Sequence, residues 1–423
     1  MPSNLFPSDS RLKPFSLLLL LAACMALSLV LPAQAQTFRV LYSFKGTPDG
    51  QSPAGGILRD RSGNLYGVTY GGGVSYDGTA FKFSSSGKET VLYSFLAGYG
   101  ANPDSTMAQD AHGNLYGTTD YGGAFDQGAV FKIDTRRNET VLYSFREGVP
   151  TFGFLPNAVI LDEQGNLYGT TKLGGLTGGC LGYGCGVVFK FDRRGKKTVL
   201  YTFNGGTDGG YPSGPIVRDT AGNLYGATAY GGDLSCYAPY GCGTIFKLSP
   251  TGKLTVLHSF TGTGGDGAQA WTGLVRDQQG NLYGATVDGG TGPNCTSDEN
   301  GCGTVFKVDK TGKETILHSF TGSGADNAPI YATLAVDAKG NIYGTTPNSG
   351  SGNCNSGCGA VFMLDPTGKD TIVHAFTGGA DGQDPQTGVI VDSAGNIYGT
   401  TAAGGDLNCN AGYGCGTIYK LSR

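Results

Sequence analysis

Residues 222–228 have the sequence Gly-Asn-Leu-Tyr-Gly-Ala-Thr, and the first five of these positions recur along the chain with little change. The shared pattern, Gly-Asn-(Leu/Ile)-Tyr-Gly, occurs seven times at intervals of about 50–60 residues, which is typical of repeat proteins. The copies begin at Gly63, Gly113, Gly165, Gly222, Gly280, Gly340 and Gly395. The sequence therefore predicts seven versions of one structural unit.

Each unit contains four short segments with the composition of β-strands. The repeated pattern leads through a Gly-rich loop into a segment of the type Gly-x-x-Phe-Lys, such as residues 243–247. A turn and a second apolar run follow, as in residues 311–320, and another loop precedes a short run that ends in Asp, as in residues 387–392. β-branched and aromatic residues between Gly, Asp and Asn turns predict strands. After the N-terminal segment, no helical period is present.

Four strands per unit, repeated seven times, predict an all-β fold, a seven-bladed β-propeller whose neighbouring blades cover one another. From the channel outward, the innermost, second, third and outermost strands are expected at positions such as residues 389–392, 396–401, 417–421 and 371–376. Residues 37–44 form a lone outermost strand, and the chain ends on a third strand at residues 416–421. We therefore expect the N-terminal strand to complete the last blade and close the ring, which removes an exposed edge.

The N-terminal 35 residues have the organisation of a secretory signal peptide. Arg11 and Lys13 precede an apolar run at residues 15–31, and Ala-Gln-Ala follows, which predicts cleavage after Ala35. Two alternatives are an uncleaved anchor, since about 17 apolar residues approach the minimum for a membrane span, and a lipoprotein attached through Cys24. The apolar run continues past Cys24, which disfavours the lipoprotein. We expect an exported, extracellular or periplasmic protein, no later transmembrane span, and one propeller domain at residues 36–423.

Composition excludes several classes of protein. Gly accounts for 75 of the 423 residues, against a usual share of about 7%, but without the three-residue period of collagen. The hydrophobic share of 39%, with 23 Tyr and 21 Phe, is too high for a disordered chain. A formal net charge of −4 disfavours a nucleic-acid partner held through phosphates.

Ten of the eleven cysteines follow the signal segment and form five local pairs between the second and third strands of units three to seven. Each pair closes a loop of variable length just before the Gly of the third strand. Export to an oxidising compartment favours disulfides over structural zinc or redox-active thiols. The predicted bridges are Cys180–Cys185, Cys236–Cys242, Cys295–Cys302, Cys354–Cys358 and Cys409–Cys415.

The strings Gly-Asn-Leu-Tyr-Gly-Thr-Thr, Tyr-Gly-Gly, Gly-Thr-Val-Phe-Lys and Thr-Val-Leu-Tyr-Ser-Phe together resemble the GloVer-type tandem repeat of exported bacterial "choice-of-anchor" proteins. The resemblance covers essentially the whole mature chain. It implies a repeat architecture on an exported bacterial protein whose anchoring segment varies between members, and it implies no established activity. This sequence departs from the anchored pattern because no C-terminal sorting segment follows the last unit.

The long loops, which follow the second and the outermost strands, share one face of a propeller, so any site is expected there. One position near the channel mouth varies within a repeated framework: the residue six places before the last Asp of each innermost strand. Trp271, Tyr331, Gln386 and Asp104 at this position form a candidate binding site, because aromatic and polar side chains stack on and hydrogen-bond a sugar or another small ligand. The alternative is a loop position under little constraint. The other occupants are Ala54, Pro156 and Ser213.

Three histidines suggest a metal site only until the repeats are aligned. His258, His318 and His374 replace a Tyr of the outermost strand, where they should diverge and be structural. Asp-Gly pairs in the long loops, such as residues 266–267, are either calcium ligands or turns, and turns are favoured because Gly adopts a positive φ. No nucleophile, metalloprotease or phosphate-binding motif is present. We therefore expect no catalytic residue, no metal and no cofactor.

These observations favour an exported, non-catalytic, monomeric propeller that binds a glycan or a cell-surface protein. Two alternatives remain open: a propeller-type enzyme such as a lactonase, a lyase or a quinoprotein dehydrogenase, and a purely structural surface protein. A propeller fold does not decide among them, because it supports many functions.

Overall fold

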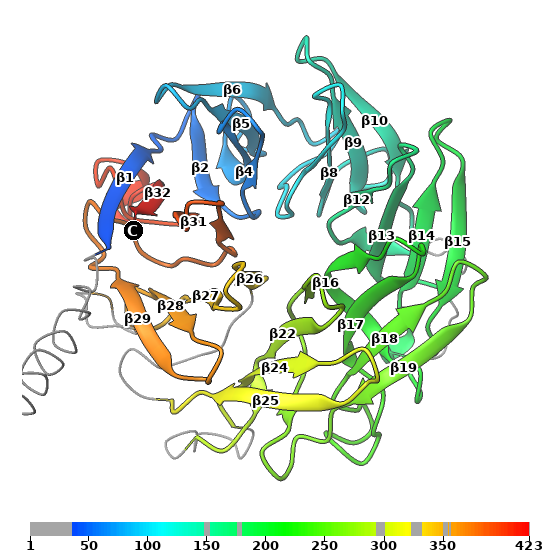
Figure 1. The fold of residues 1–423 in the computed structure, drawn as a ribbon. Helices are drawn as coiled ribbons and strands as arrows, with labels where there is room; N and C mark the ends of the chain where they lie inside the picture. The colour runs from blue at the N-terminus through cyan, green and yellow to red at the C-terminus, as the bar shows by residue number, and fades with distance from the viewer. Residues whose placement is uncertain are drawn as a thin grey trace, which may run out of the picture.

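The computed structural model describes residues 36–147, 153–175, 180–292, 301–322, 332–349, 354 and 357–422. These residues form antiparallel β-sheets arranged as seven blades around a central channel, with two short 3₁₀ turns, η1 (Cys180–Gly182) and η2 (Asn410–Gly412) (Figure 1). The predicted all-β, seven-bladed propeller is therefore confirmed. No helix in the described part of the chain has the length and apolar character needed to cross a membrane.

In blades 1 to 6 the strands follow one another from the channel outward, so chain order matches spatial order, whereas blade 7 takes its outermost strand, β1, from the N-terminus. Blade 1 contains β2 (Gly50–Pro53), β3 (Leu58–Arg59), β4 (Leu65–Gly72), β5 (Thr79–Phe83) and β6 (Glu89–Ser94). Blade 2 contains β7 (Ala108–Gln109), β8 (Leu115–Thr119), β9 (Ala129–Ile133) and β10 (Glu139–Ser144). Blade 3 contains β11 (Phe154–Pro156), β12 (Ile160–Leu161), β13 (Leu167–Leu173), β14 (Val187–Phe191) and β15 (Lys197–Thr202).

The remaining four blades repeat this arrangement. Blade 4 contains β16 (Gly210–Arg218), β17 (Leu224–Tyr230), β18 (Thr244–Leu248) and β19 (Leu254–Ser259). Blade 5 contains β20 (Gly267–Ala268), β21 (Val275–Arg276), β22 (Leu282–Thr286), β23 (Asp288–Gly289), β24 (Thr304–Val308) and β25 (Glu314–Ser319). Blade 6 contains β26 (Ala335–Val336), β27 (Ile342–Thr346), β28 (Ala360–Leu364) and β29 (Asp370–Ala375). Blade 7 contains β30 (Ile390–Val391), β31 (Ile397–Thr401), β32 (Thr417–Ser422) and the N-terminal β1 (Thr37–Ser43).

The two ends of the chain close the ring. Strand β1 pairs antiparallel with β32, from Thr37 opposite Ser422 to Ser43 opposite Thr417, and Figure 1 shows the blue and red ends side by side. Phe44, directly after β1, is fully buried and meets Phe81 of blade 1 edge to face, with ring centroids 5.1 Å apart. The predicted closure by the N-terminal strand is thus present, and it joins blade 7 to blade 1.

The core lies between the blades. Each blade supplies a Phe after its outermost strand and an aromatic residue on its third strand, and the two types meet across every interface. The centroid distances run from 4.9 to 5.8 Å, for the pairs Phe44–Phe81, Phe95–Phe131, Phe145–Phe189, Phe203–Phe246, Phe260–Phe306, Phe320–Phe362 and Phe376–Tyr419. Edge-to-face aromatic pairs stabilise a core beyond their buried area. Neighbouring blades therefore depend on each other for their cores.

The repeated Gly-Asn-(Leu/Ile)-Tyr-Gly pattern builds the turn between the first two strands of each blade. In blade 5, Asp277 accepts hydrogen bonds from the main-chain and side-chain nitrogens of Asn281, at 2.8 and 2.6 Å, and from the hydroxyl of Tyr283, at 3.0 Å. The same Asp–Asn–Tyr arrangement recurs in all seven blades. The repeated polar residues thus stabilise turns on the face opposite the long loops.

The innermost strands differ from the prediction of one short strand per blade. Both β2 and β3 pair with β4, and β16 pairs with β17 over its length with a register shift between Ser213 and Val217. The long loop after the outermost strand therefore adds β-structure at the channel. Sequence reasoning missed this segment because it carries residues such as Gln51, Ser52 and Pro53 instead of an apolar run.

Candidate functional site

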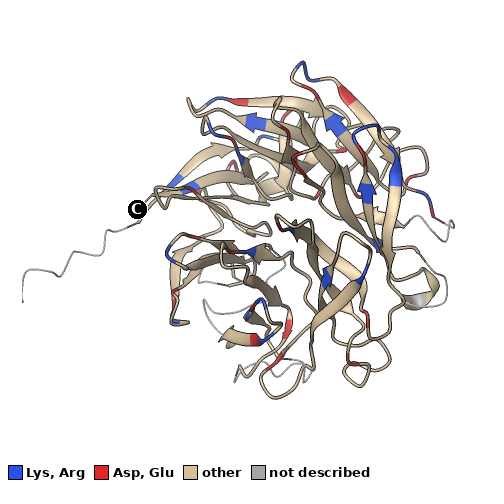
Figure 2. Cartoon of the chain, turned by 45° about the vertical axis from the view of Figure 1, so that its right-hand side comes forward, with Lys and Arg blue, Asp and Glu red and all other residues tan. Residues whose placement is uncertain are grey.

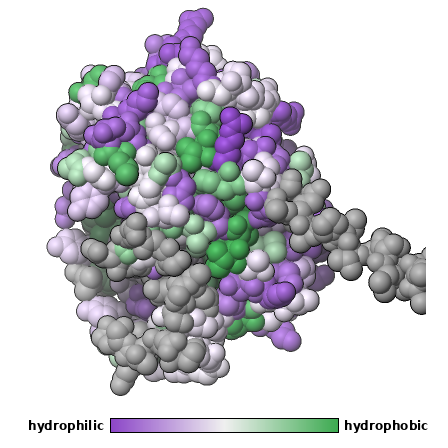
Figure 3. All heavy atoms as spheres, turned by 90° about the vertical axis from the view of Figure 1, so that its left-hand side faces the viewer, coloured by the Kyte–Doolittle hydropathy of each residue, from purple (hydrophilic) through white to green (hydrophobic). Residues whose placement is uncertain are grey.

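The long loops carry the exposed hydrophobic side chains of the molecule. Every large hydrophobic residue that is exposed in the described structure lies in these loops or at a strand end leading into one: Tyr70, Val74, Tyr76, Leu96, Tyr99, Tyr121, Phe125, Tyr183, Leu234, Tyr240, Leu407 and Tyr413. On the side drawn in Figure 3, hydrophobic side chains form small groups among hydrophilic ones. Charged residues of both signs are spread over several blades (Figure 2). The exposed hydrophobic side chains therefore distinguish the loop-rich face from the opposite face of short turns.

A cavity of about 800 Å³ occupies the channel. Its lining includes Ala54, Asp104, Ser213, Trp271 and Gln386, which all occupy the position six residues before the innermost-strand Asp. Apolar side chains in or next to the innermost strands form much of its wall, among them Leu58, Ile160, Leu334 and Ile390. The variable position thus gathers in one cavity. Pro156 does not line it, and Tyr331 lies outside the described residues.

Trp271 is the centre of an aromatic cluster on the cavity wall. Its ring lies 5.2 Å from Tyr211 and 5.9 Å from Tyr230, with interplanar angles of 68° and 84°. The indole nitrogen donates a hydrogen bond to the Oε1 atom of Gln269 at 3.0 Å. Tyr240, on the loop beyond, extends the cluster, since its centroid lies 6.0 Å from that of Tyr230. The indole is therefore held in place while remaining partly exposed.

Asp104 belongs to a charged group of three residues from blades 2 and 3. The Nζ atom of Lys172 lies 3.9 Å from an oxygen of Asp104 and 3.6 Å from an oxygen of Asp120. Burial and the neighbouring Asp120 raise the pKa of Asp104 to about 7, although Lys172 opposes the shift. Burial lowers the pKa of Lys172, but the two carboxylates outweigh it and the net shift is upward. The cavity therefore has a lysine that stays charged and a carboxyl that titrates near neutral pH.

Sequence reasoning missed a second set of residues at the channel mouth. Ser52, Asn102, Leu155, Tyr211, Gln269 and Asp384 have φ between 54° and 58°, a backbone conformation that non-glycine residues rarely adopt. The main-chain nitrogen of each donates a hydrogen bond to a carbonyl oxygen of the preceding blade. Several of their side chains then meet the predicted site. Gln269 accepts from Trp271, and Asp384 accepts from Gln386 at 2.7 Å.

A sequence signal for this second set exists: in five of the six cases a proline follows directly. In blade 4, Pro212 follows Tyr211, and the ring packs where a Cβ on Gly186 of blade 3 would lie, 2.6 Å from the proline Cδ. In the five blades whose next blade supplies this proline, the Gly before the third strand leaves room for the proline ring. The main-chain hydrogen bond to the preceding blade and the packing of the following proline therefore fix the backbone of a residue such as Tyr211. Neither contact involves the side chain of that residue, so the side chain can differ between blades.

Four of the five predicted disulfides are present: Cys180–Cys185, Cys236–Cys242, Cys354–Cys358 and Cys409–Cys415, with Cα atoms 5.1 to 5.6 Å apart. Cys295 of the fifth lies outside the described residues. Each bridge closes a long loop, and the second cysteine supplies the carbonyl oxygen that the next blade bonds, as Cys242 does for Gln269 at 2.8 Å. The bridges therefore brace the loops around the channel mouth.

His258, His318 and His374 lie on β19, β25 and β29, the outermost strands of three consecutive blades. His258 contacts Asp266 at 3.3 Å, and His374 contacts Asp381 at 3.3 Å. Asp49 accepts hydrogen bonds from Tyr42 and from the main-chain nitrogens of Lys45 and Gly50. The Asp residues of the long loops thus order turns next to the outermost strands.

Comparison with known proteins supports the repeat and the fold. Residues 30–180, 150–297 and 294–423 match the model of the Gloeobacter/Verrucomicrobia repeat. No curated protein matches the sequence significantly.

Solved structures share the propeller architecture at low identity. The extracellular domain of a protein from B. thetaiotaomicron, classed as a hybrid two-component system, has 16% identity and a TM-score of 0.57, over 92% of this chain and 43% of that one. A second structure of that extracellular domain, from a protein classed as a one-component system, has 13% identity and a TM-score of 0.53, over 92% of this chain and 40% of that one. A fungal alcohol oxidase in complex with copper has 13% identity and a TM-score of 0.53, over 92% of this chain and 76% of that one. The chain spans about two fifths of the extracellular domains, and the likeness concerns the fold alone.

Proposed function

The chain belongs to the Gloeobacter/Verrucomicrobia repeat family, and on that premise we propose that it is an exported, non-catalytic propeller that binds an oligosaccharide at its channel mouth. One observation carries the proposal: a partly exposed Trp271, held by Tyr211, Tyr230 and Gln269, shares a cavity with Asp104 and Gln386. An aromatic ring stacks on the apolar face of a sugar. Carboxylate and amide groups pair with its hydroxyls.

The size and the lining of the cavity support this proposal. Ligand sites usually enclose about 300–1,000 Å³, with mostly apolar walls and a few polar groups that orient the ligand, and the channel cavity measures about 800 Å³. The apolar innermost strands form its wall, while Asp104, Lys172 and Gln386 supply polar groups. The cavity thus has room for a short oligosaccharide.

The disulfides support an exported location. Four described bridges suit an oxidising compartment outside the cytoplasm. An extracellular location would place the loop-rich face, with its exposed aromatic residues, in contact with glycans. The extracellular domains with the same fold show that such a propeller is used outside a cell.

A binding screen tests the proposal. The chain without residues 1–35 is mixed with a panel of oligosaccharides, and thermal shifts are followed by calorimetry of the hits. Trp271→Ala should weaken binding at least 10-fold, or about 1.4 kcal/mol, because the stacking surface is lost. Tyr413→Ala is the matched control, since Tyr413 is exposed on the same face but does not line the cavity.

Three results would contradict the proposal. A panel without hits would exclude an oligosaccharide as the ligand, because a ligand at 100 times its Kd stabilises the folded state by about 2.7 kcal/mol and would be detected. Equal affinities of the parent and Trp271→Ala would place binding elsewhere. Consumption of a bound sugar by the unmodified protein would contradict the non-catalytic assignment.

A further inference from the structure

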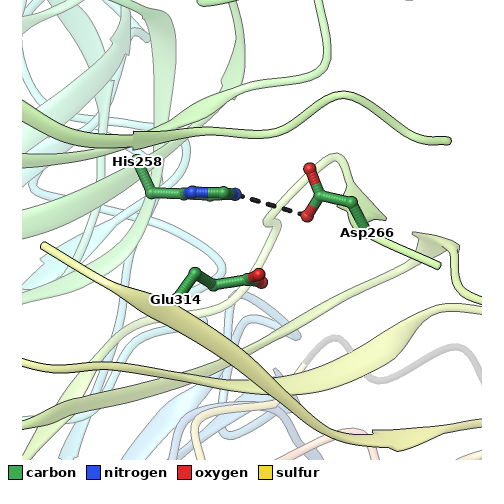
Figure 4. Close-up of side chains that lie close together, drawn as sticks. All are labelled: His258, Asp266 and Glu314. Atoms are coloured by element: carbon green, nitrogen blue, oxygen red, sulfur yellow. Dashed lines mark hydrogen bonds and ion pairs between the residues drawn. The ribbon is translucent and has the colours of Figure 1, made fainter. Parts of the chain in front are cut away.

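A second group of side chains lies at the outer rim of the propeller, away from the channel. His258 is on β19 of blade 4, Asp266 follows in the loop into blade 5, and Glu314 begins β25 of blade 5. One nitrogen of His258 and one carboxylate oxygen of each acid lie within 4.8 Å of one another. Figure 4 shows His258 and Asp266 pointing toward each other and Glu314 extending into the same space.

The donor set and the spacing suit a zinc ion. Zinc binds imidazole nitrogen and carboxylate oxygen at about 2.0–2.2 Å in tetrahedral geometry, which places two of its ligand atoms about 3.3 Å apart. The Nε2 atom of His258 and the Oδ1 atom of Asp266 are 3.3 Å apart. The same two atoms form a hydrogen bond in the structure.

Glu314 begins the outermost strand of blade 5, as Glu89 and Glu139 begin those of blades 1 and 2, and all three have a buried Oε1 atom without a hydrogen-bond partner among the described residues. Among these three acids, Glu314 is the one that shares its space with a histidine. A buried carboxylate oxygen without a partner is costly, and a bound cation removes that cost.

Asp266 is already oriented as a ligand would be. Its Oδ2 atom accepts hydrogen bonds from the main-chain nitrogen and the hydroxyl of Thr261, at 2.8 and 2.9 Å, and Oδ1 accepts one from the nitrogen of Gly267 at 2.7 Å. Hydrogen bonds from such surrounding groups fix metal-ligating carboxylates in place. The loop therefore presents Asp266 in one orientation.

The other blades show what the same positions do without a complete donor set. At the junction of blades 7 and 1, Tyr42 stands in place of His258 and donates a hydrogen bond to Asp49 at 2.9 Å. At the junction of blades 6 and 7, His374 faces Asp381, but Phe38 stacks on its ring at 3.7 Å. Among the described residues, His258, Asp266 and Glu314 are the group of three metal-binding side chains whose donor atoms all lie within 4.8 Å of one another.

We propose that His258, Asp266 and Glu314 bind a zinc ion that links the outermost strands β19 and β25, with water in the fourth position. The two carboxylates and a neutral imidazole carry a charge that a divalent cation balances. The ion would link blade 4 to blade 5 at the outer rim of the propeller.

Zinc titration of the chain without residues 1–35 and without a histidine tag tests the proposal. After treatment with a chelator, the parent protein should bind Zn²⁺ in calorimetry, and its melting temperature should rise. His258→Tyr, which copies the natural Tyr42 arrangement, and Glu314→Gln, which keeps the side-chain size, should each lose one equivalent of zinc. Co²⁺ should give the visible absorption of a tetrahedral site in the parent and lose it in both variants.

His374→Tyr is the matched control, because it makes the same substitution at a His–Asp pair that lacks a third ligand. It should bind as much zinc as the parent. Equal zinc uptake by the parent and His258→Tyr, or no uptake by the parent, would show that the three residues form only an ion pair. If His258→Tyr fails to fold, Glu314→Gln decides alone. Uptake of Ca²⁺ in place of Zn²⁺ would contradict the role of the imidazole.

Discussion

Replacing Phe44 by Ala tests whether the N-terminal strand closes the ring in solution. Phe44 is 0% exposed and lies between blades 7 and 1, with the ring of Phe81 5.1 Å away and that of Tyr42 5.3 Å away. Truncating a buried Phe to Ala usually costs about 3–5 kcal/mol, as the sum of lost burial and the cavity left behind. We expect a loss in that range for Phe44→Ala.

Phe203→Ala provides the scale for this measurement. Phe203 is also 0% exposed and lies 5.2 Å from Phe246, but its interface joins two blades that are consecutive in the chain. Both variants should therefore lose similar stability if the ring is closed. An undocked N-terminal strand would leave Phe44 exposed, where a substitution usually changes stability by less than about 0.5 kcal/mol.

Equilibrium unfolding in urea, followed by the fluorescence of the single Trp271, measures both losses from the midpoint and the slope of the transition. A Phe44→Ala midpoint equal to that of the parent, together with a large shift for Phe203→Ala, would refute the closure. Large and similar shifts would place the N-terminal strand in blade 7 in solution.

Three further predictions concern a glycine, the turns and the charged group. Gly243→Ala should destabilise the fold far more than Gly87→Ala. Both glycines have φ near 90°, which costs a non-glycine residue about 1–2 kcal/mol. A Cβ on Gly243 would lie 2.2 Å from a main-chain oxygen, whereas the space around Gly87 is open. Equal urea midpoints would contradict the clash. Acid should destabilise the fold below pH 3.8, because the pKa of Asp277 is lowered on folding; burial opposes the shift, but hydrogen bonds from its turn outweigh it. That stability is present above the unfolded pKa and is lost as pH falls through the folded pKa. The stability of Asp277→Ala should therefore depend less on acid than that of the parent. An unchanged acid dependence would exclude this turn as a source of the acid sensitivity. Lys172→Met should lower stability more at pH 8 than at pH 5, since Asp104, with its pKa near 7, is charged only at the higher pH. Equal losses of stability at both pH values would show that Lys172 does not stabilise the charged form of Asp104.

The repeated positions were predictable because their role is local. Asp277, Asn281 and Tyr283 form a turn within one blade, so their order in the chain is enough to indicate it. Cys236 and Cys242 likewise close a loop of a few residues. The lone strand at the N-terminus and the missing outermost strand of the last unit predicted the closure, because an unpaired strand edge requires a partner.

The candidate site was predictable only in part. Alignment of the repeats identified Trp271 and Asp104 as variable residues within a fixed framework, and the structure places both on the channel cavity. Tyr211 and Gln269 were missed because their role depends on a left-handed backbone and on a carbonyl group of the previous blade. Lys172 was missed because it lies at the end of a second strand, where nothing in its own repeat relates it to Asp104.

The sequence alone determined the number of blades, the strand order, the local disulfides and the expected face of a site, since each follows from spacing within a unit or from the count of units. Only the tertiary structure decided which side chains of different blades meet. Trp271 contacts Tyr211 of the neighbouring blade, and His258 and Asp266 meet Glu314, because the ring brings positions about 50–60 residues apart in sequence into contact. Such contacts depend on the angle between blades and on loop conformation, which a one-dimensional period does not contain.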